Sequence, residues 1–248
     1  MTSLRRTFSA ACTLCVTLAI SGLLAACGSS GSTAGSAIAL VGKHSITRAT
    51  LEHWTDVEAV LAYNTDPKSP VPSGVVPDPP AYVKCIAYLQ KAGTESEQAS
   101  LTHSRLKHRC QERHGMLQRH VLDILLFYYW LLDEGVEQGV RVTDAQVKKK
   151  LDQAFPSEGA YRRYLSLTGE TPANERLIIE KDLLDDGLLQ LAEVKARPRP
   201  KTVREHERML ATLATDFTHK WKARTSCSAG YIVPECKQYE GPPSLLAP

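Results

Sequence analysis

One apolar run, residues 121–132, constrains the fold of this chain more than any other feature, because Asp123 is its only charged residue. As a helix, the run is apolar on nearly every side, so it must be buried by several neighbours or lie within a membrane. A spanning helix needs roughly 20 apolar residues, and two acidic residues follow this run directly. The run therefore predicts the central helix of a buried core, over residues 116–139.

Start signals for further helices occur on both sides of that run. Thr143 and Thr202 each stand three residues before a Gln or Glu, which is the signature of a capping box. Thr171 precedes Pro172, and proline suits the first position of a helix. Thr47 is a further N-cap candidate. Together with apolar spacing, these signals predict helices over about residues 48–63, 144–155, 161–168, 172–195 and 203–221, with polar, helix-compatible sequence over 96–115.

The remaining segments are predicted to be non-helical. Residues 38–46 indicate a short strand, a turn at Gly42 and a second extended piece. Six prolines fall within residues 64–80, which predicts an exposed, extended loop. The predicted fold class is all-α with a short N-terminal β element. Residues 38–224 form its helical domain, which includes the proline-rich loop 64–80, and residues 225–248 form an irregular tail.

The N-terminal residues have the layout of a secretory signal peptide. Arg5 and Arg6 precede an apolar stretch over residues 10–26, and two alanines lead directly into Cys27. This ending resembles the lipobox of bacterial lipoproteins, whose Cys receives a diacylglycerol. We therefore predict that residues 1–26 are removed and that Cys27 is lipidated, which anchors the protein to the extracytoplasmic face of the cell membrane. Residues 27–37 are small and polar, and such a tether spans roughly 17 Å.

Four cysteines lie outside the predicted signal peptide and lipidation site: Cys85, Cys110, Cys227 and Cys236. An even number in an oxidising compartment predicts two disulfides, for which three pairings exist. We favour Cys85–Cys110 and Cys227–Cys236, because each pair is close in sequence.

A metal site is the alternative for one of these cysteines. Cys110 and His114 form an i, i+4 pair near His103 and His108, and zinc sites use such spacing. No C-x-x-C or H-E-x-x-H motif accompanies them, so we predict neither a metal nor another cofactor. Without residues 1–26 the net charge is close to zero, which removes any global argument for nucleic-acid binding.

Several segments, taken in order, resemble the SurA N-terminal-like domains of extracytoplasmic chaperones and peptidyl-prolyl isomerases of the SurA and PrsA type. The opening Val-Gly-Lys-His-Ser-Ile-Thr at residues 41–47, followed by a helix with Trp54, is the first of these. The further segments are residues 79–85, 106–110, 139–144, 155–156, 161–171, 217–227, 230–231 and 236.

The resemblance implies a helical, lipid-tethered chaperone or foldase that binds unfolded secreted proteins. Isomerase activity in that family belongs to a parvulin domain of about a hundred residues, and residues 201–248 contain no strand-rich stretch that fits one. We therefore assign no catalytic residue. The alternatives are a protein related to the isomerases and an envelope scaffold that docks through the proline-rich loop.

Aromatic residues are the candidates for peptide binding, because a holding chaperone needs exposed apolar surface. The candidates are Trp54, Phe127, Tyr128 and Trp130, together with Tyr129 and Trp221. Helical apolar stripes usually face inward, so each of these residues is also a candidate for the core.

Overall fold

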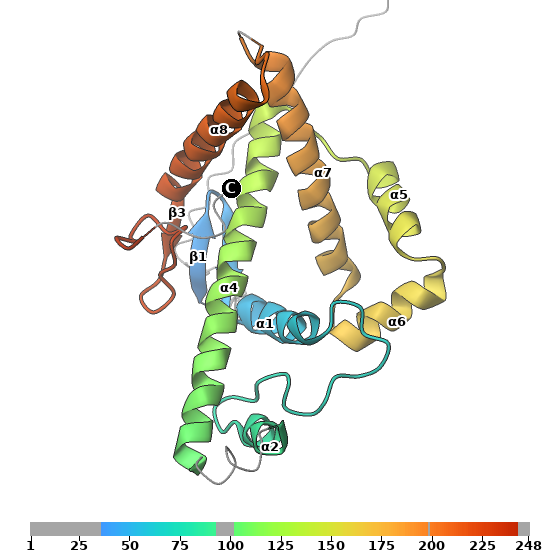
Figure 1. The fold of residues 1–248 in the computed structure, drawn as a ribbon, viewed down its shortest axis with the longest axis vertical. Helices are drawn as coiled ribbons and strands as arrows, with labels where there is room; N and C mark the ends of the chain where they lie inside the picture. Colours follow the sequence, from blue (N-terminus) through green and yellow to red (C-terminus); the bar gives the residue numbers. More distant parts are fainter. Residues whose placement is uncertain (1–35, 93–101, 198, 243–248) are drawn as a thin grey trace, which may run out of the picture. The chain divides into compact units, whose positions relative to one another are not determined.

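One long helix, α4 (His103–Gln138), runs through the part of the chain that the computed structural model describes, residues 36–92, 102–197 and 199–242 (Figure 1). The described residues all belong to the compact unit formed by residues 34–248. Cys27 and the predicted signal peptide lie outside the described residues. Within them, seven helices and a three-stranded sheet are found, which confirms the mostly helical fold with a short β element.

The middle of α4 is the core of the fold, as the apolar run predicts. Thr102 caps the helix at its N-terminus, and Gly139 ends it in the left-handed conformation with φ 73°. The side chains buried from this run are those of Val121, Leu122, Leu125, Leu126, Trp130 and Leu131. The sequence indicated polar, helix-compatible residues leading into the apolar helix, and the structure has one continuous helix of 36 residues.

The small sheet joins the two ends of the described chain. The predicted strand and extended piece on either side of Gly42 are β1 (Ala37–Val41) and β2 (His44–Thr47), which pair antiparallel. Gly42 turns the chain with φ +52°, and a Cβ there would lie 2.7 Å from a carboxylate oxygen of Asp133. Strand β3 (Thr225–Cys227) pairs with the other edge of β1, so the sheet order is β2-β1-β3. The prediction that the chain is irregular from Thr225 onward is therefore wrong for these three residues.

Four of the other helices begin at the residues that their caps predict, whereas α6 begins three residues earlier than expected and α2 was not predicted. Helix α1 (Arg48–Tyr63) follows Thr47, α5 (Asp144–Ala154) follows the capping box at Thr143, and α7 (Pro172–Lys195) follows Thr171. Helix α6 (Glu158–Thr168) is capped by Ser157, and α8 (Val203–Ala223) follows the capping box at Thr202. Helix α2 (Val83–Ala92) lies against the first half of α4.

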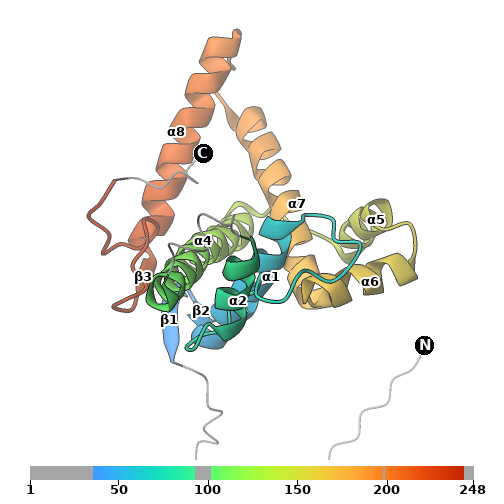
Figure 2. The same ribbon diagram turned by 60° about the horizontal axis from the view of Figure 1, so that its bottom comes forward.

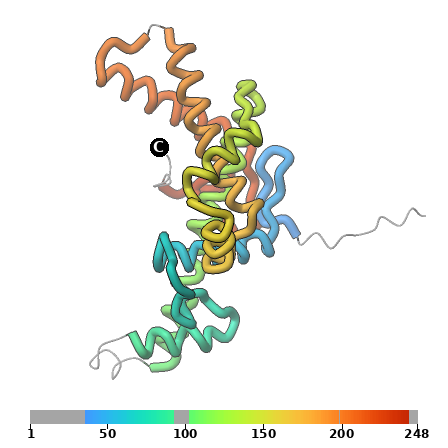
Figure 3. Tube along the Cα trace, turned by 90° about the vertical axis from the view of Figure 1, so that its right-hand side faces the viewer, coloured from blue at the N-terminus to red at the C-terminus, as the bar shows by residue number. Residues whose placement is uncertain are grey.

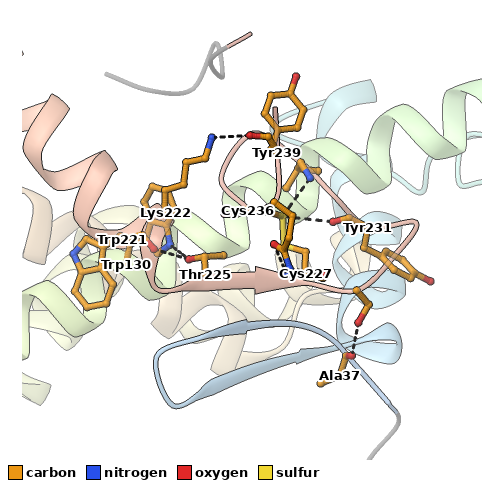
Figure 4. Close-up of a disulfide and its surroundings, with 12 residues drawn as sticks. Ala37, Trp130, Trp221, Lys222, Thr225, Cys227, Tyr231, Cys236 and Tyr239 are labelled. Atoms are coloured by element: carbon orange, nitrogen blue, oxygen red, sulfur yellow. Dashed lines mark hydrogen bonds between the residues drawn. A yellow bond between two sulfur atoms is a disulfide. The ribbon is translucent and has the colours of Figure 1, made fainter. Parts of the chain in front are cut away.

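Both favoured disulfides are present in the structure. Cys85–Cys110 joins α2 to α4 with a Cα–Cα distance of 6.1 Å. Around it, Tyr82, Ile86 and Leu106 form a small core of their own, separate from the main core. Cys227–Cys236 links the end of β3 to the segment that follows it and closes a short loop, with a Cα–Cα distance of 5.8 Å (Figure 4).

The proline-rich segment 64–80 contains no helix or strand, as predicted. It is not exposed throughout, however, because Pro67, Val75 and Pro77 are buried. Arg163 of α6 also donates a hydrogen bond to the carbonyl of Lys68 at 2.6 Å. The segment is therefore packed against the helices at several points, and the expectation of a freely extended loop is wrong there.

A buried hydrogen-bond chain ties α4 to the C-terminal strand. The indole Nε1 of Trp130 donates to Oγ1 of Thr225 at 2.7 Å, and that hydroxyl donates to the carbonyl of Trp221 at 2.8 Å (Figure 4). Thr225 is fully buried, so water cannot replace it as the acceptor. The hydroxyl thus holds β3 and the end of α8 against the central helix.

Replacing that hydroxyl is expected to destabilise the fold. Thr225→Val keeps the side-chain shape but leaves the Trp130 N–H buried without an acceptor, which costs about 1–3 kcal/mol. Urea unfolding followed by circular dichroism measures the loss. Thr215→Val is the matched control, because Thr215 makes the same local bond to the carbonyl of Ala211 at an exposed position. Equal losses for the two variants would contradict the role given to Thr225.

Candidate functional site

An apolar groove lies between the second half of α4, the second half of α7, and α8. Its volume is about 730 Å³, which falls within the range of ligand-binding pockets. Figure 2 shows α7 and α8 converging where one ends and the next begins, and separating towards α4. The large apolar side chains that line the groove are Phe127, Leu131, Leu188, Leu189, Leu191, Leu210, Leu213 and Phe217.

The groove stays open because each of its side helices is fixed mainly at one end. Helix α7 crosses α4 closely at Gly135, where a Cβ would lie 2.5 Å from a methyl carbon of Leu184. Helix α8 is anchored at its C-terminal end, where Trp221 is buried in the main core. The halves between these anchors lack a further helix to cover them, so Leu189 and Leu213 remain 43% and 39% exposed.

Ionic contacts fix one side of the groove rim. Lys220 of α8 lies 2.5 Å from Glu134 and 2.6 Å from Glu137, both on α4. The indole of Trp221 also donates to Glu134 at 2.7 Å. Burial alone raises the pKa of Glu134, but hydrogen bonds from Lys220, Gln138 and Trp221 outweigh it and hold the pKa below its ordinary value. This cluster keeps α8 attached to α4 beside the groove.

The rest of the rim is polar and slightly acidic. Asp185 of α7 and Asp216 of α8 line the groove and form none of the ion pairs found among the described residues. Lys195 also lines it and donates a hydrogen bond to Gln138 at 3.1 Å. Since Lys220 is matched by Glu134, the remaining charges are Asp185 and Asp216 against Lys195, and this small net negative charge favours cationic over anionic groups.

The predicted aromatic residues are divided between the groove and the core. Phe127 lines the groove and lies edge-to-face against Phe217, with ring centroids 5.9 Å apart. Trp54 and Trp130 lie instead in the core, where they are 8% and 2% exposed. Tyr128 is half-buried, with its ring 6.3 Å from that of Trp54.

The other two aromatic candidates also lie away from the groove lining. Tyr129 stacks on His44 at 4.9 Å, and Trp221 is buried. The leucines of α7 and α8 supply most of the apolar lining, yet we did not predict them as binding residues. Their helical spacing is visible in the sequence, but the spacing of an apolar stripe is the same whether or not another helix covers it.

Cys110 and His114, the i, i+4 pair considered for a metal, are engaged in other contacts. Cys110 is bonded to Cys85, and His114 hydrogen-bonds the hydroxyl of Tyr82 at 3.0 Å. Among the described residues, no group of three His, Cys, Asp or Glu side chains is placed to hold a metal ion. Every described helix is also too short or too polar to cross a bilayer.

No protein-family model, curated protein or solved structure matches this chain. The resemblance to SurA N-terminal-like domains therefore stays a prediction from the sequence.

Two pairs of carboxyl groups are buried away from the groove. Asp123 of α4 lies beside Glu235, and burial together with that neighbour raises the pKa of Asp123 to about 9. Glu170 lies beside Glu175, and burial together with this second carboxyl raises the pKa of Glu170 to about 8. Each pair therefore keeps a proton to a higher pH than an isolated carboxyl group does, which lowers like-charge repulsion inside the fold.

These raised pKa values predict that stability falls as the pH rises. The folded state keeps a proton on Asp123 that the unfolded chain loses above about pH 4, so the stabilisation is complete below that pH and is lost towards pH 9. Between about pH 5 and pH 8 we expect a loss of about 1–2 kcal/mol, discounted for the solvent that reaches Asp123. Urea unfolding at each pH measures it.

Asp123→Asn tests the assignment, because the amide is neutral at every pH. We expect a flatter pH profile for this variant, with a remaining slope from Glu170. Asp186→Asn, at an exposed position on α7, is the control and should keep the full slope. A profile for Asp123→Asn as steep as that of the unmodified chain would refute the assignment.

Proposed function

We propose that this chain is a lipid-anchored, extracytoplasmic chaperone-like protein that holds apolar segments of unfolded polypeptides in the groove between α4, α7 and α8. The observation that carries the proposal is the groove itself, whose lining is mostly leucine and phenylalanine and is partly open to solvent. Exposed apolar surface of this kind marks binding sites on soluble domains. Kinship with SurA and PrsA-type proteins, suggested by the ordered segments in the sequence, belongs to the same proposal.

The charges of the rim favour a peptide over a lipid as the occupant. A fatty acid or phospholipid carries an anionic head, which Asp185 and Asp216 would repel. A polypeptide presents both hydrogen-bond donors and acceptors, and its Lys or Arg side chains pair with those two carboxylates. The best clients are therefore apolar segments with basic residues nearby.

The predicted anchor explains why such a groove suits secreted clients. A lipid on Cys27 and the short tether after it keep the helical unit close to the outer face of the membrane. Chains that emerge from the export machinery are unfolded at that place. Groove binding there shields their apolar segments until they fold.

Suppression of aggregation tests the groove. Residues 28–248 retain every described contact, and a stoichiometric amount is expected to suppress aggregation of a reduced, unfolded client, followed by light scattering. Leu189→Asp combined with Leu213→Asp places charges on the apolar lining and should weaken suppression about tenfold or more. The matched control is Val136→Asp with Val203→Asp, since both valines are exposed and lie outside the groove lining. Failure of the unmodified chain to suppress aggregation would refute the proposal.

Metabolic labelling tests the anchor separately. The full chain expressed in a bacterium and fed a clickable palmitate analogue is expected to carry the label and to fractionate with membranes. Cys27→Ser should abolish both, because only that thiol receives the lipid. Cys12→Ser and Cys15→Ser, within the same N-terminal segment, are controls that should keep the label. Labelling that persists in Cys27→Ser would exclude lipidation at that residue.

A further inference from the structure

The first half of α4 carries a strongly basic surface that the groove does not use. Residues 102–120 contain five Lys or Arg residues and one acidic residue, Glu112, although the whole chain has a net charge of only +3. Arg105, Arg109 and Arg113 follow one another at intervals of four, so they lie along one face of the helix. We call these three residues the arginine stripe.

Within residues 36–92, 102–197 and 199–242, no carboxylate forms an ion pair with the arginine stripe. Arg105 and Arg109 are exposed and Arg113 is half-buried. Glu112, the acidic residue nearest in sequence, lies 3.4 Å from His108. Arg105 and Arg109 therefore face outward with their charge available to a partner, and Arg113 is accessible in part.

The small disulfide core fixes the direction in which the stripe points. Leu106 and Cys110 are buried against α2, and the Cys85–Cys110 bridge holds the two helices together. Arg105 and Arg109 lie on a different face of α4 from these buried residues, whereas Arg113 follows Leu106 by seven residues and lies towards the half-buried side. Lys84 and Lys91 are exposed on α2, which the disulfide joins to this end of α4. We call these five cations the basic platform.

We infer that this platform docks on the surface of an anionic lipid bilayer. Positive charge attracts the negative lipid headgroups, and each Lys or Arg near such a surface strengthens binding about fivefold. Met116 is 57% exposed and follows Arg109 by seven residues on the same side of α4, which provides an apolar residue among the cations. An acidic protein is the competing partner, but the proposed lipid anchor holds this surface within reach of a bilayer at all times. The inference rests on that anchor from the proposed function.

The platform and the groove are separate surfaces. Arg109 and Leu131 are 22 positions apart on one continuous helix, which corresponds to about 33 Å along α4. Figure 3 shows α2 and the start of α4 at one end of this helix, and α7 with α8 at the other. The platform thus lies near one end of α4 and the groove near the other. Lipid bound at the platform therefore leaves the groove lining free for a client.

Vesicle co-sedimentation tests the inference without the anchor. Residues 28–248 are expected to bind phosphatidylglycerol-rich vesicles at low salt, to dissociate at high salt, and not to bind pure phosphatidylcholine vesicles. Changing Arg105, Arg109 and Arg113 to Gln should lower the partition coefficient about 100-fold, from about fivefold for each charge. The matched control changes Lys148, Lys149 and Lys150 of α5 to Gln, which removes the same charge from another exposed helix.

Three results would overturn the inference: equal loss in the α5 control, equal binding to neutral vesicles, or retention on polyglutamate without binding to vesicles. The last would assign the platform to an acidic protein. Thermal unfolding checks that the stripe variant folds. If the half-buried Arg113 proves necessary for folding, the double variant Arg105→Gln with Arg109→Gln, at two exposed positions, replaces it in the vesicle assay. Aggregation suppression should be unchanged in the stripe variant, which separates this inference from the proposed groove function.

Discussion

Burial of the apolar middle of α4 is the constraint on which the remaining structure depends. A helix that is apolar on nearly every side needs neighbours around it, and here they come from distant parts of the chain. Helix α1 and strand β1 pack against it from the N-terminal part, and α7 and the end of α8 from the C-terminal part. The bond from Trp130 to Thr225 fixes the last of these contacts, because a buried indole N–H requires a partner.

The groove forms where the packing of α7 and α8 against the core ends. Contacts with the core hold α7 near Leu184 and α8 near Trp221, but the connection between them lies beyond the reach of the core. The leucines in the outer halves of the two helices therefore face each other across a space that no described element fills. The slightly acidic rim of the groove and the basic stripe lie towards different ends of α4 and therefore differ in electrostatic character.

The local structure was largely predictable because its causes are local. A threonine side chain that accepts a hydrogen bond three residues later fixes a helix start, and Thr143, Thr171 and Thr202 each did so. Strand β3 was not predicted because the tripeptide Thr-Ser-Cys becomes a strand only by pairing with the free edge of β1, and β1 lies far away in sequence. The packing of segment 64–80 was missed for the same reason: prolines exclude helices but do not say what the loop touches.

Local patterns in the sequence were sufficient for the helical fold class, the position of the central helix and most of the caps, because periodicity and capping act within a few residues. For the cysteines they favoured one of three pairings. Which apolar faces are covered depends on packing between distant parts of the chain. That packing placed Trp54 and Trp130 in the core and left Leu189 and Leu213 beside an open groove. All four are apolar residues on helices with the same kind of spacing. Burial depends on which neighbour arrives from elsewhere in the chain, and that information is not local.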